Sequence, residues 1–500
     1  MSGLSWHNIG YSVMEKKKSK RLLENISGEC LPGQVIAILG SSGAGKSTLL
    51  SVLSGRATGS IDGQVLVNGK PRDPNEWLRM TSFVEQDDLF YDQITVHESI
   101  QFSANLKLPN LSRNARDEIV TKTITELGLI NVKDSKIGNP EDRGISGGER
   151  KRCAIAVELV TDPDILFLDE PTSGLDSFIA FNLINTLKEL AVERKKTIVM
   201  TIHQPRETIV QLFDKIMLLS QGRTIFFGSM ENGLQHFSTL NYNCPEDSNP
   251  ANFFIDMITL DYRTEEKQKE SKDRIEHLKA NCNKATTQYP EMDNEEYSKN
   301  SKSGLMKFNA SWPYEMMLLL QRDYKNTFRN PATLGATVGG GLFSLLIFSV
   351  IYYDTSDSPA GVQNRQGLIF NMALNALFGS LNCINYFPAE KPIIRKERSA
   401  GMYRSFSSYL SKVLSNFPLI ILQVAVLPLP IYWIVGLRND FGRFLVYLLI
   451  IFIETITATF MGFMIGALVP TVTIGQIFGP LLGNSYSCSC IVYGFWRSIC

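Results

Sequence analysis

The most constraining feature of this sequence is a glycine-rich loop between an expected strand and an expected helix. The apolar, β-branched run VIAIL occupies residues 35–39, and GSSGAGKST follows it before a pattern with helical spacing. This stretch satisfies the spacing G-x-x-x-x-G-K-[ST], in which backbone N–H groups surround a phosphate, the lysine reaches phosphate oxygens and the hydroxyl ligates Mg²⁺. We therefore expect a nucleotide to be bound by Gly40, Ser41, Ser42, Gly43, Ala44, Gly45, Lys46, Ser47 and Thr48.

A second group of motifs, between residues 139 and 176, fits the same ligand. Ser146, Gly147 and Gly148 precede an expected helix, ERKRCAIAVELV, so bare N–H groups at its N-terminus are suited to grip an anion. The run ILFLDE reads as a buried strand that presents Asp169 and Glu170 at its end. One carboxylate can hold Mg²⁺, and the next can orient or activate a water molecule.

The order of these motifs resembles the nucleotide-binding domain of an ABC transporter. The glycine-rich loop is followed by a glutamine after a strand, SGGE, LDEP, SGLD and a late histidine. The details RGISGGERKR, DEPTSGLDS and TIHQPR, with an apolar region after the nucleotide domain, resemble the G (White-type) subfamily. The resemblance covers residues 1 to about 480. It implies an α/β P-loop NTPase fold with a helical subdomain, followed by an all-α polytopic transmembrane domain.

The resemblance also implies a role for each motif residue. ATP and Mg²⁺ would be the cofactors, with Mg²⁺ held by Ser47, Gln86 and Asp169. Glu170 would act as base or water orienter, Gln86 would contact the attacking water, and His203 would contact the γ-phosphate. Ser146, Gly147 and Gly148 of a partner subunit would cap that phosphate, with Asp176 at the dimer seam. Family members often stack an aromatic residue on adenine; here Val13 occupies that position, and we expect nearby Tyr11 to belong to the sheet instead.

Composition separates the chain into a soluble part and a membrane part. The 50 basic and 50 acidic residues cancel, which gives no support for a nucleic-acid partner. The eight cysteines include no C-x-x-C pair, and the N-terminus lacks the apolar stretch of a signal peptide. We expect a nucleotide-binding domain over 1–260 in the cytosol, a charged flexible linker over 261–310, an amphipathic connecting helix over 311–333, and an incomplete transmembrane domain over 334–500.

About five membrane spans are expected in that last domain. Uncharged or nearly uncharged runs long enough to cross a bilayer lie at about 334–353, 367–387, 416–437, 444–469 and from 471 onward. The 388–412 loop carries six basic and two acidic residues, whereas the 354–366 loop carries one and two. The positive-inside rule therefore places the 388–412 loop and the nucleotide domain on the cytosolic side. The chain is expected in the plasma membrane or an intracellular membrane.

Two features leave alternatives open. Glu454, near the middle of the fourth span, has either a structural hydrogen-bonding role or a role in transport or coupling. After GPLLGNSY the sequence no longer resembles the family, which has six spans, so we expect a truncated, alternatively spliced or frame-shifted end.

Three hypotheses for the function follow. The first is an ATP-driven exporter of lipid-like or amphipathic molecules, working as a homo- or heterodimeric half-transporter. The second is a subunit or decoy that binds ATP and dimerises without moving cargo. The third is a soluble ABC ATPase, which the apolar runs disfavour.

Overall fold

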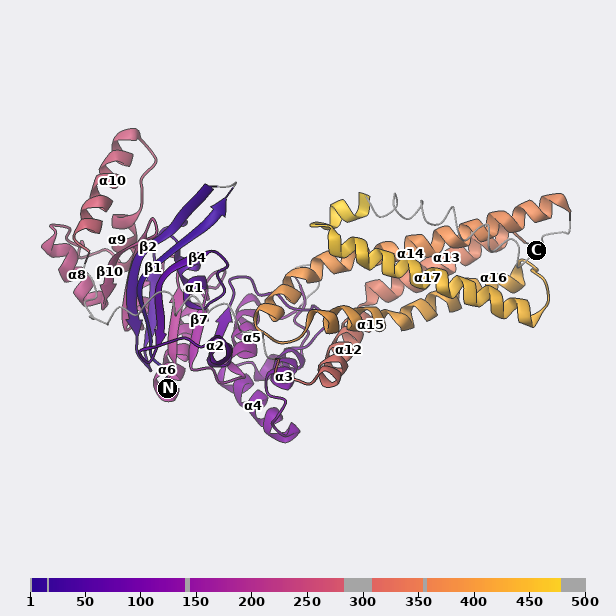
Figure 1. Cartoon of the computed structure of the whole chain (residues 1–500), viewed down its shortest axis with the longest axis horizontal. Helices are drawn as coiled ribbons and strands as arrows, with labels where there is room; N and C mark the ends of the chain where they lie inside the picture. Colours follow the sequence, from indigo (N-terminus) through magenta and orange to yellow (C-terminus); the bar gives the residue numbers. More distant parts are fainter. Residues whose placement is uncertain (1, 16–17, 140–143, 283–307, 354–357, 478–500) are drawn as a thin grey trace. The chain divides into compact units, whose positions relative to one another are not determined.

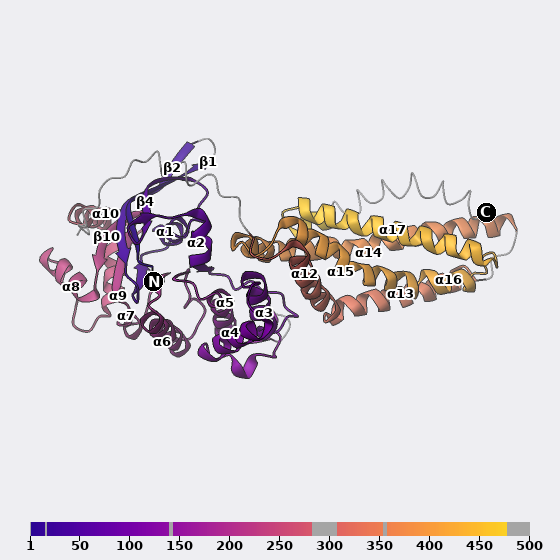
Figure 2. The same cartoon turned by 60° about the horizontal axis from the view of Figure 1, so that its bottom comes forward.

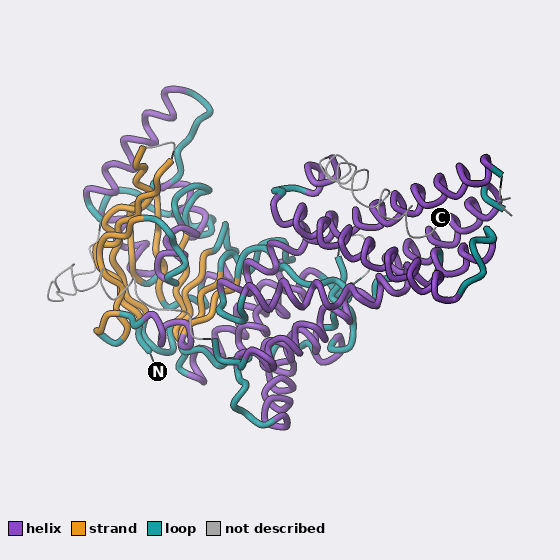
Figure 3. The backbone as a smooth tube through the Cα atoms, turned by 45° about the vertical axis from the view of Figure 1, so that its right-hand side comes forward, coloured by secondary structure: helices purple, strands orange, loops and turns teal. Residues whose placement is uncertain are grey.

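The computed structural model describes residues 2–15, 18–139, 144–282, 308–353 and 358–477. The chain divides into two compact units. The first contains Met1–Asp88, Thr95–Ala310 and Ser399–Met402, and the second contains Leu89–Ile94, Ser311–Arg398 and Tyr403–Cys500. Figure 3 shows strands (orange) in the first unit, whereas the second is built from helices (purple).

The first unit is organised around a six-stranded sheet, of which β7 and β10 are labelled in Figure 1. Its order is β10-β9-β3-β8-β7-β6, and all neighbours are parallel except β9 and β10. The runs VIAIL, ILFL and TIVMT are buried along their whole length, as expected for parallel strands covered on both faces. The strands are β3 (Val35–Leu39), β6 (Thr81–Val84), β7 (Ile165–Leu168), β8 (Thr197–Thr201), β9 (Lys215–Ser220) and β10 (Arg223–Gly228).

A four-stranded antiparallel sheet shares its core with the first. It contains β1 (Leu4–Glu15), β2 (Lys18–Cys30), β4 (Ser60–Val67) and β5 (Lys70–Pro71), in the order β2-β1-β4-β5. A tight hairpin turn joins β4 to β5, with Asn68 and Gly69 both at positive φ, 50° and 77°. Tyr11 is buried in the core, and its hydroxyl accepts the Gly59 N–H at 3.1 Å. Position 28, inside β2, requires glycine because a Cβ there would lie 2.6 Å from the Trp6 ring.

The predicted helical subdomain is formed by α3, α4 and α5, which lie together in Figure 2. Thr95 and Ser112 cap α3 and α4 by accepting backbone N–H groups of the first turn. The helices of the unit are α1 (Lys46–Leu53), α2 (Pro74–Met80), α3 (Val96–Lys107), α4 (Arg113–Glu126), α5 (Gly147–Leu159), α6 (Ser177–Arg194), α7 (Glu207–Val210), α8 (Met230–Thr239), α9 (Pro250–Ile258) and α10 (Glu265–Ala280), with the 3₁₀ turn η1 (Ile130–Val132).

The prediction of a flexible linker over 261–310 is wrong for residues 265–280, which form α10. Composition suggested too few apolar residues for packing, but Ser271, Ile275 and Leu278 recur at helical spacing and are all buried. Arg274 Nε also donates to the Met257 carbonyl at 2.9 Å, near the end of α9. Three well-spaced side chains and one arginine therefore attach a helix that is otherwise highly charged. Residues 283–307 lie outside the described residues.

The second unit contains the expected connecting helix and the long apolar helices. Three described helices are long and apolar enough to cross a membrane: Pro331–Ile351, Ser405–Ile434 and Phe441–Leu468. The expected second span lies within α14, where the side chains of 376–386 are not described, and most of the expected fifth lies beyond residue 477. The helices are α12 (Trp312–Phe328), α13 (Pro331–Ile351), α14 (Pro359–Ser399), α15 (Ser405–Val426), α16 (Pro428–Ile434) and α17 (Phe441–Leu468).

The expected 388–412 loop is largely helical. α14 continues to Ser399, and α15 begins at Ser405 rather than at residue 416. This arrangement takes Lys412 into a helix, where its Nζ lies 2.8 Å from Glu390 Oε1. Six basic residues between two apolar runs predict a loop there. The ion pair with Glu390 lets the Lys412 side chain lie buried within the helix.

Candidate nucleotide-binding site

The glycine-rich loop joins the end of β3 to the start of α1. Gly43 and Gly45 have φ of 78° and 102°, a conformation that other residues rarely adopt. A Cβ on Gly40 would also lie 2.4 Å from the Leu219 carbonyl oxygen, so this close approach requires glycine. The loop therefore turns sharply and leads directly into the N-terminus of α1, where backbone N–H groups favour an anion.

Lys46 folds back over this loop. Its Nζ donates to the carbonyl oxygens of Gly40 at 2.9 Å and Ser41 at 3.1 Å, and the residue is only 6% exposed. Burial lowers the pKa of Lys46, while the negative charges of Glu170 and Asp169 oppose that shift. The ammonium group thus lies at the loop where phosphate oxygens would be bound.

Ser47 and Asp169 make up the core of the candidate metal site. Ser47 Oγ donates to Asp169 Oδ1 at 2.9 Å, although the two residues come from different motifs. Gln86 follows β6 at the carboxyl end of the strands, as Asp169 follows β7. The Gln86 amide Nε2 donates to Glu170 Oε2 at 2.9 Å. Hydroxyl, carboxylate and amide oxygens are the ligands that Mg²⁺ prefers, so these residues fit that ion.

Glu170 is held in an unusual backbone conformation. Its φ is 45°, in the left-handed region that costs a non-glycine residue about 1–3 kcal/mol. Its N–H donates to Thr201 Oγ1 at 2.9 Å, and the same hydroxyl donates to Asp169 Oδ1. Thr201 was not predicted from the sequence. The available signal was a polar residue at the carboxyl end of an otherwise apolar strand.

His203 follows β8 at this same edge of the sheet. Because β3, β8 and β7 are adjacent and parallel, the segments that follow them start side by side. The imidazole is exposed, and it makes no hydrogen bond or ion pair with another described residue. The structure therefore places His203 near the predicted region without fixing its side chain.

The signature residues are positioned by two helix caps. Ser146 caps α5 in a capping box with Glu149, and Asp176 caps α6 by accepting the N–H groups of Phe178 and Ile179, each at 3.0 Å. A Cβ on Gly148 would lie 2.8 Å from Ile179 Cγ2, so the two helix starts touch. Ser146 and Gly147 are exposed, and a Cβ on Gly147 would meet nothing within 4 Å. The tip is therefore accessible.

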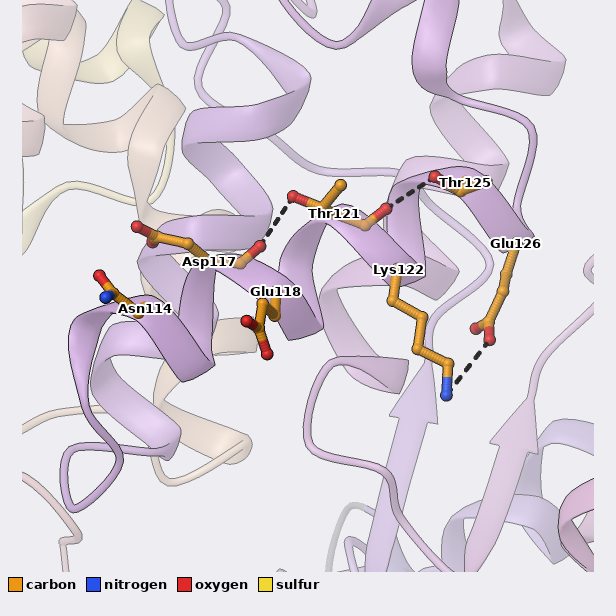
Figure 4. Close-up of a pocket in the computed structure, with 7 residues that line it drawn as sticks. All are labelled: Asn114, Asp117, Glu118, Thr121, Lys122, Thr125 and Glu126. Carbon is orange, nitrogen blue, oxygen red and sulfur yellow. Dashed lines mark hydrogen bonds and ion pairs between the residues drawn. The ribbon is translucent and has the colours of Figure 1, made fainter.

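The open pocket shown in Figure 4 is a separate feature. All seven lining residues lie on one face of α4, and none belongs to the predicted nucleotide site. The side chains are mixed in charge, with Lys122 paired to Glu126 at 4.0 Å. We assign no role in nucleotide chemistry to this surface, which is lined by Asn114, Asp117, Glu118, Thr121, Lys122, Thr125 and Glu126.

Comparisons with known families cover both units. Residues 23–173 match the family described as ABC transporter. Residues 314–485 match the family described as ABC-2 type transporter, and residues 203–310 match a second family with the same description.

Three relatives match nearly the whole chain. ABC transporter G family member 7 of Arabidopsis thaliana is 34% identical over 98% of this chain and 69% of its own length. The broad substrate specificity ATP-binding cassette transporter ABCG2 of Sus scrofa is 35% identical over 93% of this chain and 75% of its own length. ATP-binding cassette sub-family G member 5 of Rattus norvegicus is 32% identical, over 96% and 74%.

These matches agree with the fold, with the phosphate loop and with the carboxylates that face it. The first unit is an ATP-hydrolysing domain, and the second belongs to an integral membrane protein. ATP hydrolysis in this molecule is coupled to transport. The chain belongs to the G (White-type) subfamily of ABC transporters and is a half-transporter.

Proposed function

We propose that two such half-transporters form a dimer that exports lipid-like or amphipathic small molecules across a membrane. The observation that carries the dimer is the exposed signature tip at Ser146 and Gly147. The chain holds one phosphate loop and one such tip, and in this architecture the tip of one subunit closes over the loop of another. The partner is a second copy or a related half-transporter.

An exposed phenylalanine beside the tip supports the same interface. Phe178 is 74% exposed in the first turn of α6, two residues after Asp176. Gly148 and Ile179 bring this helix start against the signature helix. Burying a phenylalanine side chain contributes about 1.5–3 kcal/mol, so a partner that covers this seam would be stabilised by it.

The first steps of the proposed chemistry are binding and closure. The loop of residues 40–48 binds the ATP phosphates, and Lys46 transfers its hydrogen bonds from the Gly40 and Ser41 carbonyls to phosphate oxygens. Ser47, Gln86 and Asp169 would hold Mg²⁺, which supplies charge neutralisation on those oxygens. The partner's signature tip then caps the γ-phosphate.

Hydrolysis follows within the closed site. Glu170 orients a water molecule and accepts its proton as the water oxygen bonds to the γ-phosphorus and the bond to the bridging oxygen breaks. Gln86, already hydrogen-bonded to Glu170, positions the same water, and His203 donates to the γ-phosphate. ADP and phosphate then leave, and the two nucleotide domains separate.

The membrane part of the proposal concerns orientation and cargo. By the positive-inside rule, the basic residues between 388 and 412 support an orientation in which this segment and the ATPase domain both face the cytosol. Closure and reopening would switch the helices between inward- and outward-facing states, as nucleotide binds one state better than the other. Apolar helices such as α13 and α17 suit lipid-like or amphipathic cargo better than strongly hydrophilic cargo.

Reconstitution in liposomes tests this proposal. Full-length protein and the Glu170→Gln variant are given ATP, and movement of a fluorescent phospholipid analogue and of radiolabelled sucrose is measured. We expect the wild-type protein to move the phospholipid analogue but not sucrose. The variant should bind ATP without hydrolysing it and should move neither probe. Hydrolysis without movement of the lipid probe would instead support the non-transporting subunit. Full hydrolysis by the Glu170→Gln variant would contradict the assignment of Glu170.

A further inference from the structure

Lys151 is a buried lysine to which the proposed ATP chemistry gives no part. It lies in the second turn of α5, is 2% exposed, and belongs to the signature ERKR. Its Nζ donates to the backbone carbonyl oxygen of Gln86 at 2.8 Å and pairs with Asp88 Oδ1 at 2.9 Å. A buried ammonium requires such partners, because desolvation disfavours a charge that is not paired.

The first partner connects Lys151 to the hydrolytic carboxylate. Lys151 fixes the backbone of Gln86, and the Gln86 side chain donates to Glu170 Oε2 at 2.9 Å. The helix that carries Lys151 begins at the cap residue Ser146. The Lys151 ammonium group therefore joins α5 to Gln86. In the proposed dimer α5 reaches the partner's nucleotide, whereas Gln86 contacts Glu170 of its own subunit.

The second partner connects Lys151 to the chain that enters the membrane unit. Asp88 is the last residue of the first unit before Leu89–Ile94, which belong to the second. Within that second unit, the Arg322 guanidinium lies 4.3 Å from the centre of the Tyr91 ring, and Arg322 Nη1 donates to Glu397 Oε1 at 2.7 Å. The segment that leaves Asp88 is thus held by a buried charge on α12.

We propose that Lys151 is a positioning residue that makes the signature helix, Gln86 and the segment leading to Tyr91 move together. This inference rests on the proposed dimer. When a partner's nucleotide draws in Ser146, α5 carries Lys151, which moves the Gln86 backbone and the Asp88 carboxylate. Closure at one ATP site therefore sets the water-orienting geometry at the other and pulls on the chain that enters the membrane unit.

A second buried lysine, whose partner lies on α5, provides the matched control. Lys107 of α3 pairs with Glu158 of α5 at 2.9 Å, and both side chains are largely buried, 12% and 4% exposed. This pair joins α5 to α3, and its lysine lies on α3 rather than on the helix that carries Lys151. Lys107→Met should therefore reproduce the loss of a buried ion pair without the loss of positioning.

The test uses full-length protein in liposomes, with Lys151→Met, Lys151→Arg, Asp88→Asn and Lys107→Met compared with wild type. ATP affinity, kcat, thermal unfolding and phospholipid analogue moved per ATP are measured. For Lys151→Met we expect near-normal ATP affinity and a fall in kcat of about 10- to 100-fold, as for other small misplacements of a reacting group. Lys151→Arg should recover most of kcat, because it keeps the charge and donors.

Two outcomes separate positioning from plain stability. Asp88→Asn keeps the contact of Lys151 with the Gln86 carbonyl, so it should retain most of kcat but move less lipid probe per ATP. Lys107→Met should unfold at a lower temperature while keeping both kcat and probe moved per ATP. Folded Lys151→Met that matches Lys107→Met in every readout would overturn the inference.

An Asp88→Asn variant that moves as much lipid probe per ATP as wild type would also overturn the inference. This variant decides between the outcomes if Lys151→Met does not fold. The kcat readout does not depend on cargo. If the wild-type protein hydrolyses ATP but moves no probe, export fails as a proposal, while the comparison of kcat between Lys151→Met and Lys107→Met still judges Lys151.

Discussion

Ser47 Oγ donates a hydrogen bond to Asp169 Oδ1 at 2.9 Å, although 122 residues separate them in the chain. Their strands, β3 and β7, are not neighbours, because β8 lies between them. Thr201 at the end of β8 completes the connection, since its hydroxyl donates to the same Asp169 oxygen and accepts the Glu170 N–H. Three strand ends are thereby fixed relative to one another.

Replacing Thr201 with valine should impair hydrolysis more than it impairs stability. The change removes the shared hydroxyl and leaves the Glu170 N–H without its acceptor, at a cost of about 1–3 kcal/mol. We expect a lower kcat and a higher Mg²⁺ requirement, because Asp169 and Glu170 both lose a fixed neighbour. ATPase assays over a range of Mg²⁺ concentrations measure both quantities.

Thr197 at the other end of β8 is the matched control. It is fully buried, and its hydroxyl donates to the Ser2 carbonyl at 2.7 Å, away from the carboxylates. Thr197→Val should lose comparable stability but keep the wild-type Mg²⁺ dependence. If the two variants change kcat to the same extent, Thr201 has no special part in arranging the site.

Much of the site could be predicted because its residues follow strands in recognisable motifs. Ser47, Gln86, Asp169 and Glu170 were all expected at one edge, and parallel strands bring them there. Thr201 and Lys151 were missed because their partners are distant in sequence and no spacing rule connects them. A buried lysine inside a basic motif cannot be distinguished by composition from its half-buried basic neighbours.

The boundaries of the fold were harder to predict for a related reason. The composition of residues 265–280 predicts a linker because charge dominates it, yet Ser271, Ile275 and Leu278 are enough to give α10 a buried side. An uncharged run predicts the third span only from about residue 416, whereas α15 begins at Ser405 and includes Lys412, whose charge Glu390 neutralises from another helix. In both cases a contact between distant residues overrode the local pattern.

Replacing Leu278 with aspartate should detach α10 from the first unit. Leu278 is fully buried, so a carboxylate there would lose the apolar contact and be desolvated, at a cost of about 3 kcal/mol or more. Limited proteolysis should then cut within 265–280 much faster. Lys272→Asp introduces the same side chain on the exposed side of α10 and should leave the cleavage rate unchanged. Equal cleavage of both variants would show that α10 is not anchored by this residue.

Replacing Arg322 with methionine should destabilise the second unit strongly. Arg322 is buried and donates to both Glu397 oxygens, at 2.7 and 2.9 Å, so its loss leaves Glu397 without its main counter-charge. Breaking a buried pair from one side costs about 3–5 kcal/mol. Thermal unfolding in detergent measures this cost. The double variant Arg322→Met, Glu397→Met should be more stable than Arg322→Met alone, because no buried charge is then left unpaired.

Arg404 offers a milder comparison in the same unit. Its guanidinium donates to Glu315 at 2.6 Å, but Glu315 also accepts the backbone N–H of residue 404 at 2.8 Å. Arg404→Met therefore leaves the carboxylate with one partner. A loss of stability as large as that of Arg322→Met would show that burial of the pair, rather than the remaining partner, sets the cost.

Glu24→Gln should change how stability depends on pH. The hydrogen bond from Arg223, 2.7 Å from Glu24, holds the pKa of that carboxyl below its usual value of 4.5. A depressed pKa contributes stability above the unfolded value, and this contribution is lost as pH falls through the folded value. Wild type should thus unfold at a slightly higher temperature than the variant near pH 6. The two should converge in strong acid, and a constant difference at every pH would exclude the ion pair as its source.

Glu454→Gln should alter transport without altering ATP binding. Glu454 is 6% exposed near the middle of α17, yet it makes no hydrogen bond or ion pair with another described residue. The neighbouring hydroxyls are already used, since Thr455 and Thr459 each donate to a carbonyl one turn earlier. A buried acid in a membrane span is costly, so we infer a role with cargo or with the partner subunit. Lipid probe transport and thermal unfolding are measured together, with Glu454→Leu as the variant that also removes the polar group. Stability unchanged or raised by both replacements, with transport lowered by both, is the expected result. Normal transport by Glu454→Leu would assign the carboxyl no role in moving cargo.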